Sequence, residues 1–184
     1  AQFVDPLQVT PYQLTFQLFM YLALAFSIIN TPLWSAYTNA WTLGRITWIK
    51  KTIRRMLFIF AVLVIGSAVA VLISPFIFKF WIGDRVIIPM GLVALVVLMI
   101  LINIWTSIFD FFINGVGKIQ LQMRLSIIAA IINIPLSYIL SIKFELGVNG
   151  IVIASIISLS ITAITAPIQA YMILLKKDRG IWSK

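Results

Sequence analysis

Long runs of apolar residues without a single charge dominate this chain, and short charged segments separate them. An α-helix rises about 1.5 Å per residue, so about 20 apolar residues cross a hydrocarbon core of about 30 Å. Five runs predict membrane-spanning helices, near residues 14–43, 56–78, 86–114, 121–142 and 148–175. The pattern therefore predicts an all-α, polytopic membrane helix bundle that forms one transmembrane domain over residues 1–184.

Composition supports a membrane protein and excludes several kinds of chemistry. The 184 residues are 62% hydrophobic and 10% charged, whereas a soluble domain is about 45–50% apolar and about 25% charged. The chain has no histidine and no cysteine, which excludes disulfides, thiol nucleophiles and the commonest zinc ligands. We therefore expect no cofactor and no metal.

The net charge of +9 would suggest a nucleic-acid partner in a soluble chain, but here it indicates membrane topology. The loop after the first span, the loop after the third and the carboxyl tail collect 11 basic residues, against three in the other loops. Cytoplasmic loops are rich in Lys and Arg, so we expect the amino end outside, the carboxyl end in the cytoplasm, and no nucleic-acid partner.

This orientation bears on whether the chain is complete. An outside amino end without a signal peptide or an initiator methionine needs something upstream to deliver it across the membrane. We expect a carboxyl-terminal part of a longer polytopic protein. The alternative is a whole five-span protein inserted with its amino end outside.

Two charged side chains fall at the ends of spans. Asp110 lies near the cytoplasmic end of the third predicted span, and Arg124 lies just inside the fourth, at a similar distance from the intervening turn at Gly115-Val116-Gly117. A carboxylate in lipid costs about 2.5–3.5 kcal/mol at the bilayer centre. The two residues either neutralise each other or reach the interface, or Asp110 takes part in handling a substrate or ion.

Asparagines and prolines recur inside the spans. An amide in hydrocarbon needs hydrogen-bond partners, so each asparagine either joins helices or lines a cavity. Prolines follow two of them closely, and proline kinks a helix by removing a backbone donor. The residues concerned are Asn30, Asn39, Asn103, Asn114 and Asn133, with Pro32 and Pro135 as the kinking prolines.

Two tryptophans and a row of small residues complete the set. Trp34 and Trp105 fall inside spans, where an indole either packs in the core or offers a flat face to a sugar ring or lipid. Small residues recur every fourth position in the last span, which favours close helix packing; they are Gly150, Ala154, Ser158, Thr162 and Ala166.

Signals of catalysis are missing. The step Gly117-Lys118 lacks the earlier glycine and the following Ser or Thr of a phosphate-binding loop. No paired carboxylates lie at helical spacing, as a glycosidase would need. We therefore expect a protein that is not an enzyme.

Several motifs occur in an order that resembles the O-antigen and exopolysaccharide flippases of the multidrug/oligosaccharidyl-lipid/polysaccharide exporter superfamily. A kinked span leads into a cationic loop, and further motifs follow over nearly the whole chain. They are TPLWSAYTNA at 31–40, WIKK at 48–51, FWIG at 80–83, NGVGK at 114–118, NIPLS at 133–137 and GVNG at 147–150.

The resemblance implies a twelve-span transporter with two six-helix bundles around a central cavity, of which this chain holds the last five spans. It implies movement of undecaprenyl-diphosphate-linked oligosaccharides across a bacterial inner membrane by alternating access, with membrane lipid and the missing amino-terminal half of the protein as partners. The family's cationic cavity is not evident here, because Arg124 is the only base within a span. The cavity bases therefore lie in the missing half, or the anion is held otherwise.

The residues expected along the substrate path are Asn30, Pro32, Trp34, Asn103, Trp105, Asp110, Asn114, Arg124 and Asn133. Two other functions stay open. A cation-coupled multidrug exporter of the same superfamily would use intramembrane carboxylates, for which Asp110 is the single candidate. A scaffold subunit that transports nothing would have spans that pack without a polar cavity.

Overall fold

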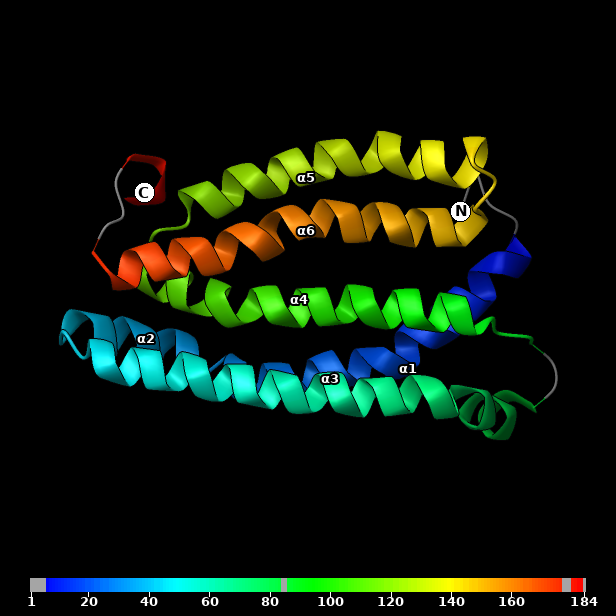
Figure 1. Cartoon of the computed structure of the whole chain (residues 1–184), viewed down its shortest axis with the longest axis horizontal. Coiled ribbons are helices and arrows are strands. Elements are labelled where there is room, and N and C mark those ends of the chain that lie inside the picture. The colour runs from blue at the N-terminus through cyan, green and yellow to red at the C-terminus, as the bar shows by residue number, and fades with distance from the viewer. Residues whose placement is uncertain (1–5, 84–85, 177–179, 184) are drawn as a thin grey trace.

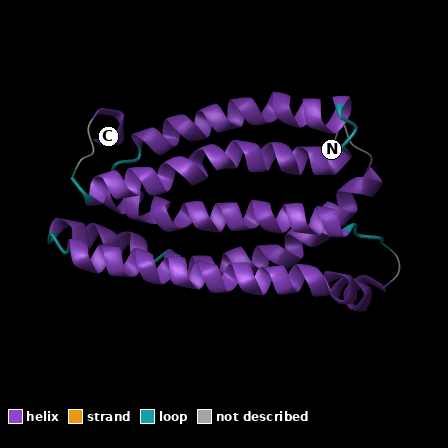
Figure 2. Ribbon diagram, viewed as in Figure 1, coloured by secondary structure: helices purple, strands orange, loops and turns teal. Residues whose placement is uncertain are grey.

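The computed structural model describes residues 6–83, 86–176 and 180–183. The described part consists of helices joined by loops and turns (Figure 2). In chain order these are α1 (Pro6–Asn30), α2 (Leu33–Thr42), α3 (Ile46–Ile82), α4 (Met90–Val116), α5 (Gln120–Tyr138), the π-helical turn η2 (Ile139–Lys143), α6 (Gly147–Leu174) and the 3₁₀ turn η3 (Gly180–Ser183).

Together these elements form five spans that are long and apolar enough to cross a membrane. The first span combines α1 and α2, and the fourth combines α5 and η2. This confirms the predicted number of spans and the all-α class. The five spans are Val9–Thr42, Ile46–Ile82, Met90–Val116, Gln120–Lys143 and Gly147–Leu174. The second span begins at Ile46, well before residue 56, because the helix continues through the basic segment. Long basic side chains can extend from a helix end to the aqueous interface, so they do not end the helix.

Helix α4 is the centre of the bundle. It contacts α1, α2 and α3 on one side and α6 on the other, and α5 covers the outer side of α6 (Figure 1). Its buried residues include Val93, Val96, Ile108 and Phe112. Because these neighbours surround α4, a path for a polar substrate cannot follow the covered faces of α4. It must follow helix faces that the other helices of the bundle leave exposed.

The five spans alternate in direction, so their connections gather at two ends of the bundle (Figure 1). The α2–α3 turn, the α4–α5 turn and the end of α6 share one end, and the α3–α4 and α5–α6 connections share the other. The basic segments counted for topology therefore lie together. Four basic residues in that count lie outside the described residues, namely Arg85, Lys177, Arg179 and Lys184, and so do the acids Asp5, Asp84 and Asp178.

Prolines interrupt the spans to different degrees. At Pro32 the first span breaks, and α1 ends at Asn30 while α2 starts at Leu33, which confirms the kink predicted there. Pro75 lies inside α3 without ending it. Pro75 cannot donate to the carbonyl of Val71, and the Ser74 hydroxyl donates to that carbonyl instead, at 2.7 Å.

Close packing between α6 and the turn η2 explains part of the row of small residues in the last span. Pro135 lies in α5 just before the π-helical turn. Gly150 of α6 lies against this turn so closely that an added Cβ would come within 2.6 Å of the Leu140 carbonyl carbon. Gly150, Ala154, Ser158 and Ala166 are buried, as a packing surface requires.

Candidate functional site

The break in the first span is attached to the central helix. Asn30, the last residue of α1, is completely buried. Its Nδ2 donates to the carbonyl oxygen and to the Oγ of Ser107 on α4, both at 3.2 Å. Its Oδ1 is buried and has no hydrogen-bond partner among the described residues. The amide thus fixes the point at which the span bends.

Beyond the break, α2 packs tightly on α4 at Gly115. A Cβ added to Gly115 would lie 2.9 Å from the Tyr37 Cβ and 3.0 Å from the Trp34 carbonyl oxygen. The Thr38 hydroxyl donates to the Gly115 carbonyl at 2.9 Å. The Tyr37 ring is fully buried and meets the Phe112 ring edge-on. Helices α2 and α4 therefore form one unit.

The side of α2 next to this contact is exposed and polar. Four hydroxyl side chains, at Thr31, Ser35, Thr38 and Thr42, recur every third or fourth residue along it, the spacing of one helix face. The hydroxyls of Ser35 and Thr42 donate to carbonyls of their own segment, and a hydroxyl that donates can still accept. This face therefore exposes hydrogen-bond acceptors.

Trp34 adds an aromatic surface beside these hydroxyls. Its side chain is 49% exposed and meets the Phe111 ring edge-on at 6.3 Å. An indole exposed beside a polar helix face has the composition of a saccharide-binding surface, with an apolar ring plane and hydrogen-bonding groups alongside.

Helix α3 shows what a lipid-facing surface looks like in the same molecule. The exposed side chains in its charge-free part are apolar, among them Phe58, Ile65, Leu72 and Phe76. Exposed polar groups in hydrocarbon cost free energy unless they find partners. The polar face of α2 is therefore suited to water or protein, and the outer face of α3 to lipid.

Helix α4 carries a row of polar residues. Asn103, Ser107, Asp110 and Asn114 are spaced by four, three and four residues, so they share one face. Asn103 is exposed, and the other three are partly buried. The Asn103 Nδ2 donates to the Met99 carbonyl of the same helix at 3.0 Å. Through Ser107 this row is in direct contact with the break in the first span.

Of the alternatives for Asp110 and Arg124, the pairing is not formed. The Asp110 carboxylate accepts a hydrogen bond of 2.5 Å from the Nε2 of Gln122 on α5, and Arg124 is exposed. The reason is helical rotation: two residues along a helix turn the side chain by about 200°. Since Gln122 faces α4, Arg124 points away from it.

Trp105 lies on another face of α4 from this row and connects three helices. Its Nε1 donates to the Ala163 carbonyl of α6 at 2.9 Å, and its ring contacts the rings of Phe60 and Phe109. Pro167, four residues after Ala163, has no N–H to donate to that carbonyl. The indole replaces the missing donor, so the environment of Trp105 is that of a core residue.

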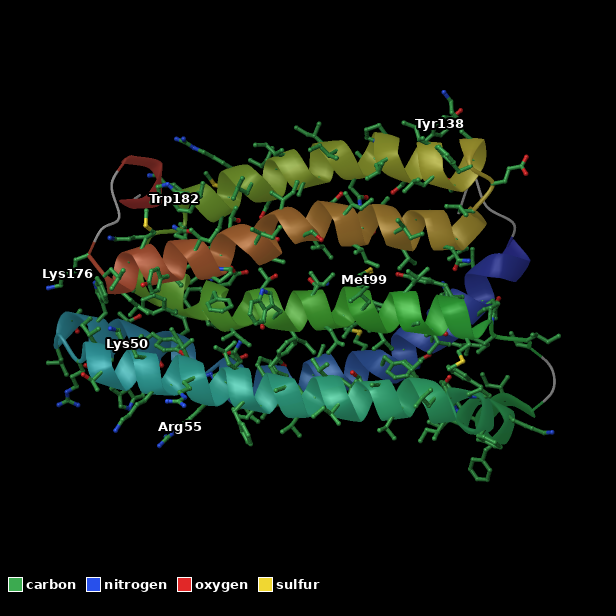
Figure 3. All side chains as sticks on the ribbon, in the orientation of Figure 1. Lys50, Arg55, Met99, Tyr138, Lys176 and Trp182 are labelled. Carbon is green, nitrogen blue, oxygen red and sulfur yellow. The ribbon has the colours of Figure 1, made fainter. Side chains whose placement is uncertain are left out.

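Asn133 is also separate from the α2–α4 unit. Its Nδ2 lies 3.4 Å from the Ser155 Oγ and 3.3 Å from the Ser158 Oγ, both on α6. These residues line a cavity of about 370 Å³ between α4, α5 and α6, together with Met99 and Thr162; Figure 3 shows Met99 in the middle of the bundle. The expected path residues thus fall into separate groups.

Sequence reasoning missed three polar residues that connect helices. Ser107 holds Asn30, Gln122 holds Asp110, and the buried Gln169 donates to the Lys118 carbonyl at 2.9 Å, fixing the α4–α5 turn to α6. For Ser107 the sequence did contain a signal, because it follows Asn103 by four residues and so lies on the same face of α4. Among the described residues no three His, Cys, Asp or Glu side chains gather as a metal site would require.

A bundle of five membrane-spanning helices with a polar face on the broken first span is typical of a polytopic transporter. The MatE family matches residues 2–139, and the chain belongs to this family. It is therefore a multi-pass membrane exporter of the multidrug/oligosaccharidyl-lipid/polysaccharide exporter superfamily, and not an enzyme. No curated protein and no solved structure matches the chain.

Proposed function

We propose that this exporter moves lipid-linked oligosaccharides, of the O-antigen or exopolysaccharide kind, across the membrane by alternating access. The observation that carries the proposal is the exposed face of α2, where Trp34 lies beside a row of hydroxyl groups. A saccharide offers both hydroxyls and an apolar ring face, and this surface complements both. The proposal also rests on the resemblance of the motifs at residues 31–40 and 114–118.

The break at Pro32 supplies a place at which the span can bend during transport. Asn30 fixes the bend to α4 through Ser107, and Gly115 keeps α2 close to α4. Helices that are interrupted near a binding site are a recurring device of secondary transporters. We propose that α2 and α4 move together, with the amino-terminal half of the same protein completing the cavity.

We also propose that the amino end of this segment is outside and its carboxyl end is in the cytoplasm of a bacterial inner membrane. The basic segments at one end of the bundle support this orientation. They include Arg45, Lys50, Lys51, Arg54 and Arg55 near the α2–α3 turn, and cytoplasmic loops are enriched in such residues.

A cation-coupled multidrug exporter is the second candidate, because Asp110 is partly buried on the polar face of α4. It is the only acid within the spans, and Gln122 already donates to it. A site that binds a lipophilic cation through carboxylates would therefore have only Asp110 available within these spans. The exposed polar face of α2 is unexplained by this function and also by a scaffold that transports nothing.

The test is restoration of surface polysaccharide by the full-length gene in a host lacking its own oligosaccharide-lipid flippase. Trp34→Ala should reduce restoration roughly fivefold, which corresponds to the loss of an aromatic contact of about 1 kcal/mol. Trp81→Ala is the matched control, since Trp81 is 48% exposed and lies at the end of α3. It should leave restoration unchanged at equal membrane abundance.

Two outcomes would contradict the proposal. Equal export by Trp34→Ala and wild type would remove this face from the path. Failure of the wild-type gene to restore polysaccharide, together with drug resistance that Asp110→Asn abolishes, would establish the multidrug exporter instead.

A further inference from the structure

The beginning of α3 forms a basic hollow at the surface of the bundle. Lys51, Arg54, Arg55, Phe58 and Ile59 line it, and its volume is about 490 Å³. Their spacing of three, one, three and one residues places them on one helix face. The three basic side chains are exposed, and Figure 3 shows Arg55 directed away from the bundle. We call these five residues the basic hollow.

The positive charge of the basic hollow has no counter-charge nearby among the residues that the structure describes. The sequence has no Asp or Glu from residue 6 to residue 83. The described residues include two acids, of which Asp110 is bonded to Gln122 on α5 and Glu145 lies in the α5–α6 connection at the opposite end of the bundle. Lys51 and Arg55 are four residues apart, and like charges at this spacing repel each other on a helix.

The position of the hollow along α3 places it at the membrane surface. The charge-free run of α3 covers residues 56–78 and is roughly 35 Å long at about 1.5 Å per residue, close to the thickness of a hydrocarbon core. The bases of the hollow thus lie at the depth of the lipid headgroups. Phe58 is 71% exposed and lies at the depth where the acyl chains begin.

We infer that the basic hollow binds the headgroup of an anionic phospholipid. The phosphodiester would lie between Lys51, Arg54 and Arg55, since guanidinium groups bind phosphate oxygens in pairs. An acyl chain would continue along Phe58 and the apolar outer face of α3. A soluble anion would match the charge but leave this apolar continuation unused, whereas a phospholipid matches both.

The experiment uses the full-length protein in neutral detergent, with phosphatidylglycerol and phosphatidylcholine of equal chain length as probes. Bound lipid is counted by native mass spectrometry over a titration. Phosphatidylglycerol should be retained in preference to phosphatidylcholine. In the triple variant Lys51→Gln, Arg54→Gln, Arg55→Gln its affinity should fall about fivefold for each charge removed.

Two further variants separate a specific site from general charge. The exchange Lys51→Arg, Arg54→Lys, Arg55→Lys keeps the charge but leaves one guanidinium group in place of two, so it should keep the preference for phosphatidylglycerol at a lower affinity than wild type. The triple variant Arg124→Gln, Lys143→Gln, Lys176→Gln removes three exposed bases elsewhere and should leave it unchanged.

Three results would overturn the inference. The first is equal retention of the two lipids by the wild-type protein. The second is equal loss of phosphatidylglycerol in both charge-removing variants. The third is competition for the site by inorganic phosphate but not by phosphatidylglycerol, which would assign the hollow to a soluble anion.

Discussion

The hydrogen bond from Trp105 to α6 can be tested by giving its acceptor another donor. The Trp105 Nε1 donates to the Ala163 carbonyl at 2.9 Å, which Pro167 cannot serve because proline has no N–H. Trp105→Phe keeps an aromatic ring against Phe60 and Phe109 but removes the donor. The carbonyl is then left inside the bundle without its partner.

The size of the effect follows from this geometry. Leaving a buried carbonyl without a donor costs about 1–3 kcal/mol in proteins, and hydrogen bonds between membrane helices average about 0.6 kcal/mol with a maximum near about 1.7. We expect Trp105→Phe to lower the free energy of unfolding by about 1–1.5 kcal/mol. In the Pro167→Ala background the N–H of residue 167 can donate to the Ala163 carbonyl. Trp105→Phe should therefore lower the free energy of unfolding by less than about 0.5 kcal/mol in that background.

The assay is unfolding in mixed micelles by increasing SDS, followed by circular dichroism so that losing a tryptophan does not alter the signal. The four proteins form a double-mutant cycle, with an expected coupling of about 1 kcal/mol. Trp41→Phe is the control, since the Trp41 ring meets Phe112 and its Nε1 donates to no described residue. If Trp105→Phe lowered the free energy of unfolding equally with Pro167 and with Ala at residue 167, the indole would not be replacing the donor that Pro167 lacks.

Two further predictions concern packing and topology. Gly115→Ala should destabilise the protein by about 1–3 kcal/mol in the same assay, because the new Cβ would force α2 away from α4. Gly66 has open space around it, so Gly66→Ala is the control and should be neutral or slightly stabilising. Equal effects of the two substitutions would contradict the close approach of α2 to Gly115. In intact cells an impermeant thiol reagent should label Ile87→Cys, which is 89% exposed in wild type, but not Thr47→Cys; labelling of Thr47→Cys from outside would reverse the proposed orientation.

Features that depend on chain composition alone were predictable from the sequence. The five spans follow because a charged residue in hydrocarbon is costly, so charge-free runs mark the segments that cross. A kink after Asn30 was predictable because Pro32 lacks a backbone donor. The complete break was not, since Pro75 also lacks a donor and lies inside α3 without ending it. The burial of Gly150 and Ala154 follows because small residues at every fourth position leave room for a neighbouring helix.

Only the tertiary structure decided which faces of the helices meet. Lipid is as apolar as a protein core, so the hydrophobic pattern of a spanning helix does not show which side faces its neighbours. Rotating α5 by two residues would exchange Gln122 for Arg124 opposite Asp110, and the sequence does not distinguish these rotations. The same holds for Trp105, whose indole meets the Ala163 carbonyl because α4 and α6 pack at one particular depth and rotation. Helix rotation is set by the sum of many side-chain contacts between spans, and these exist only once the bundle has assembled.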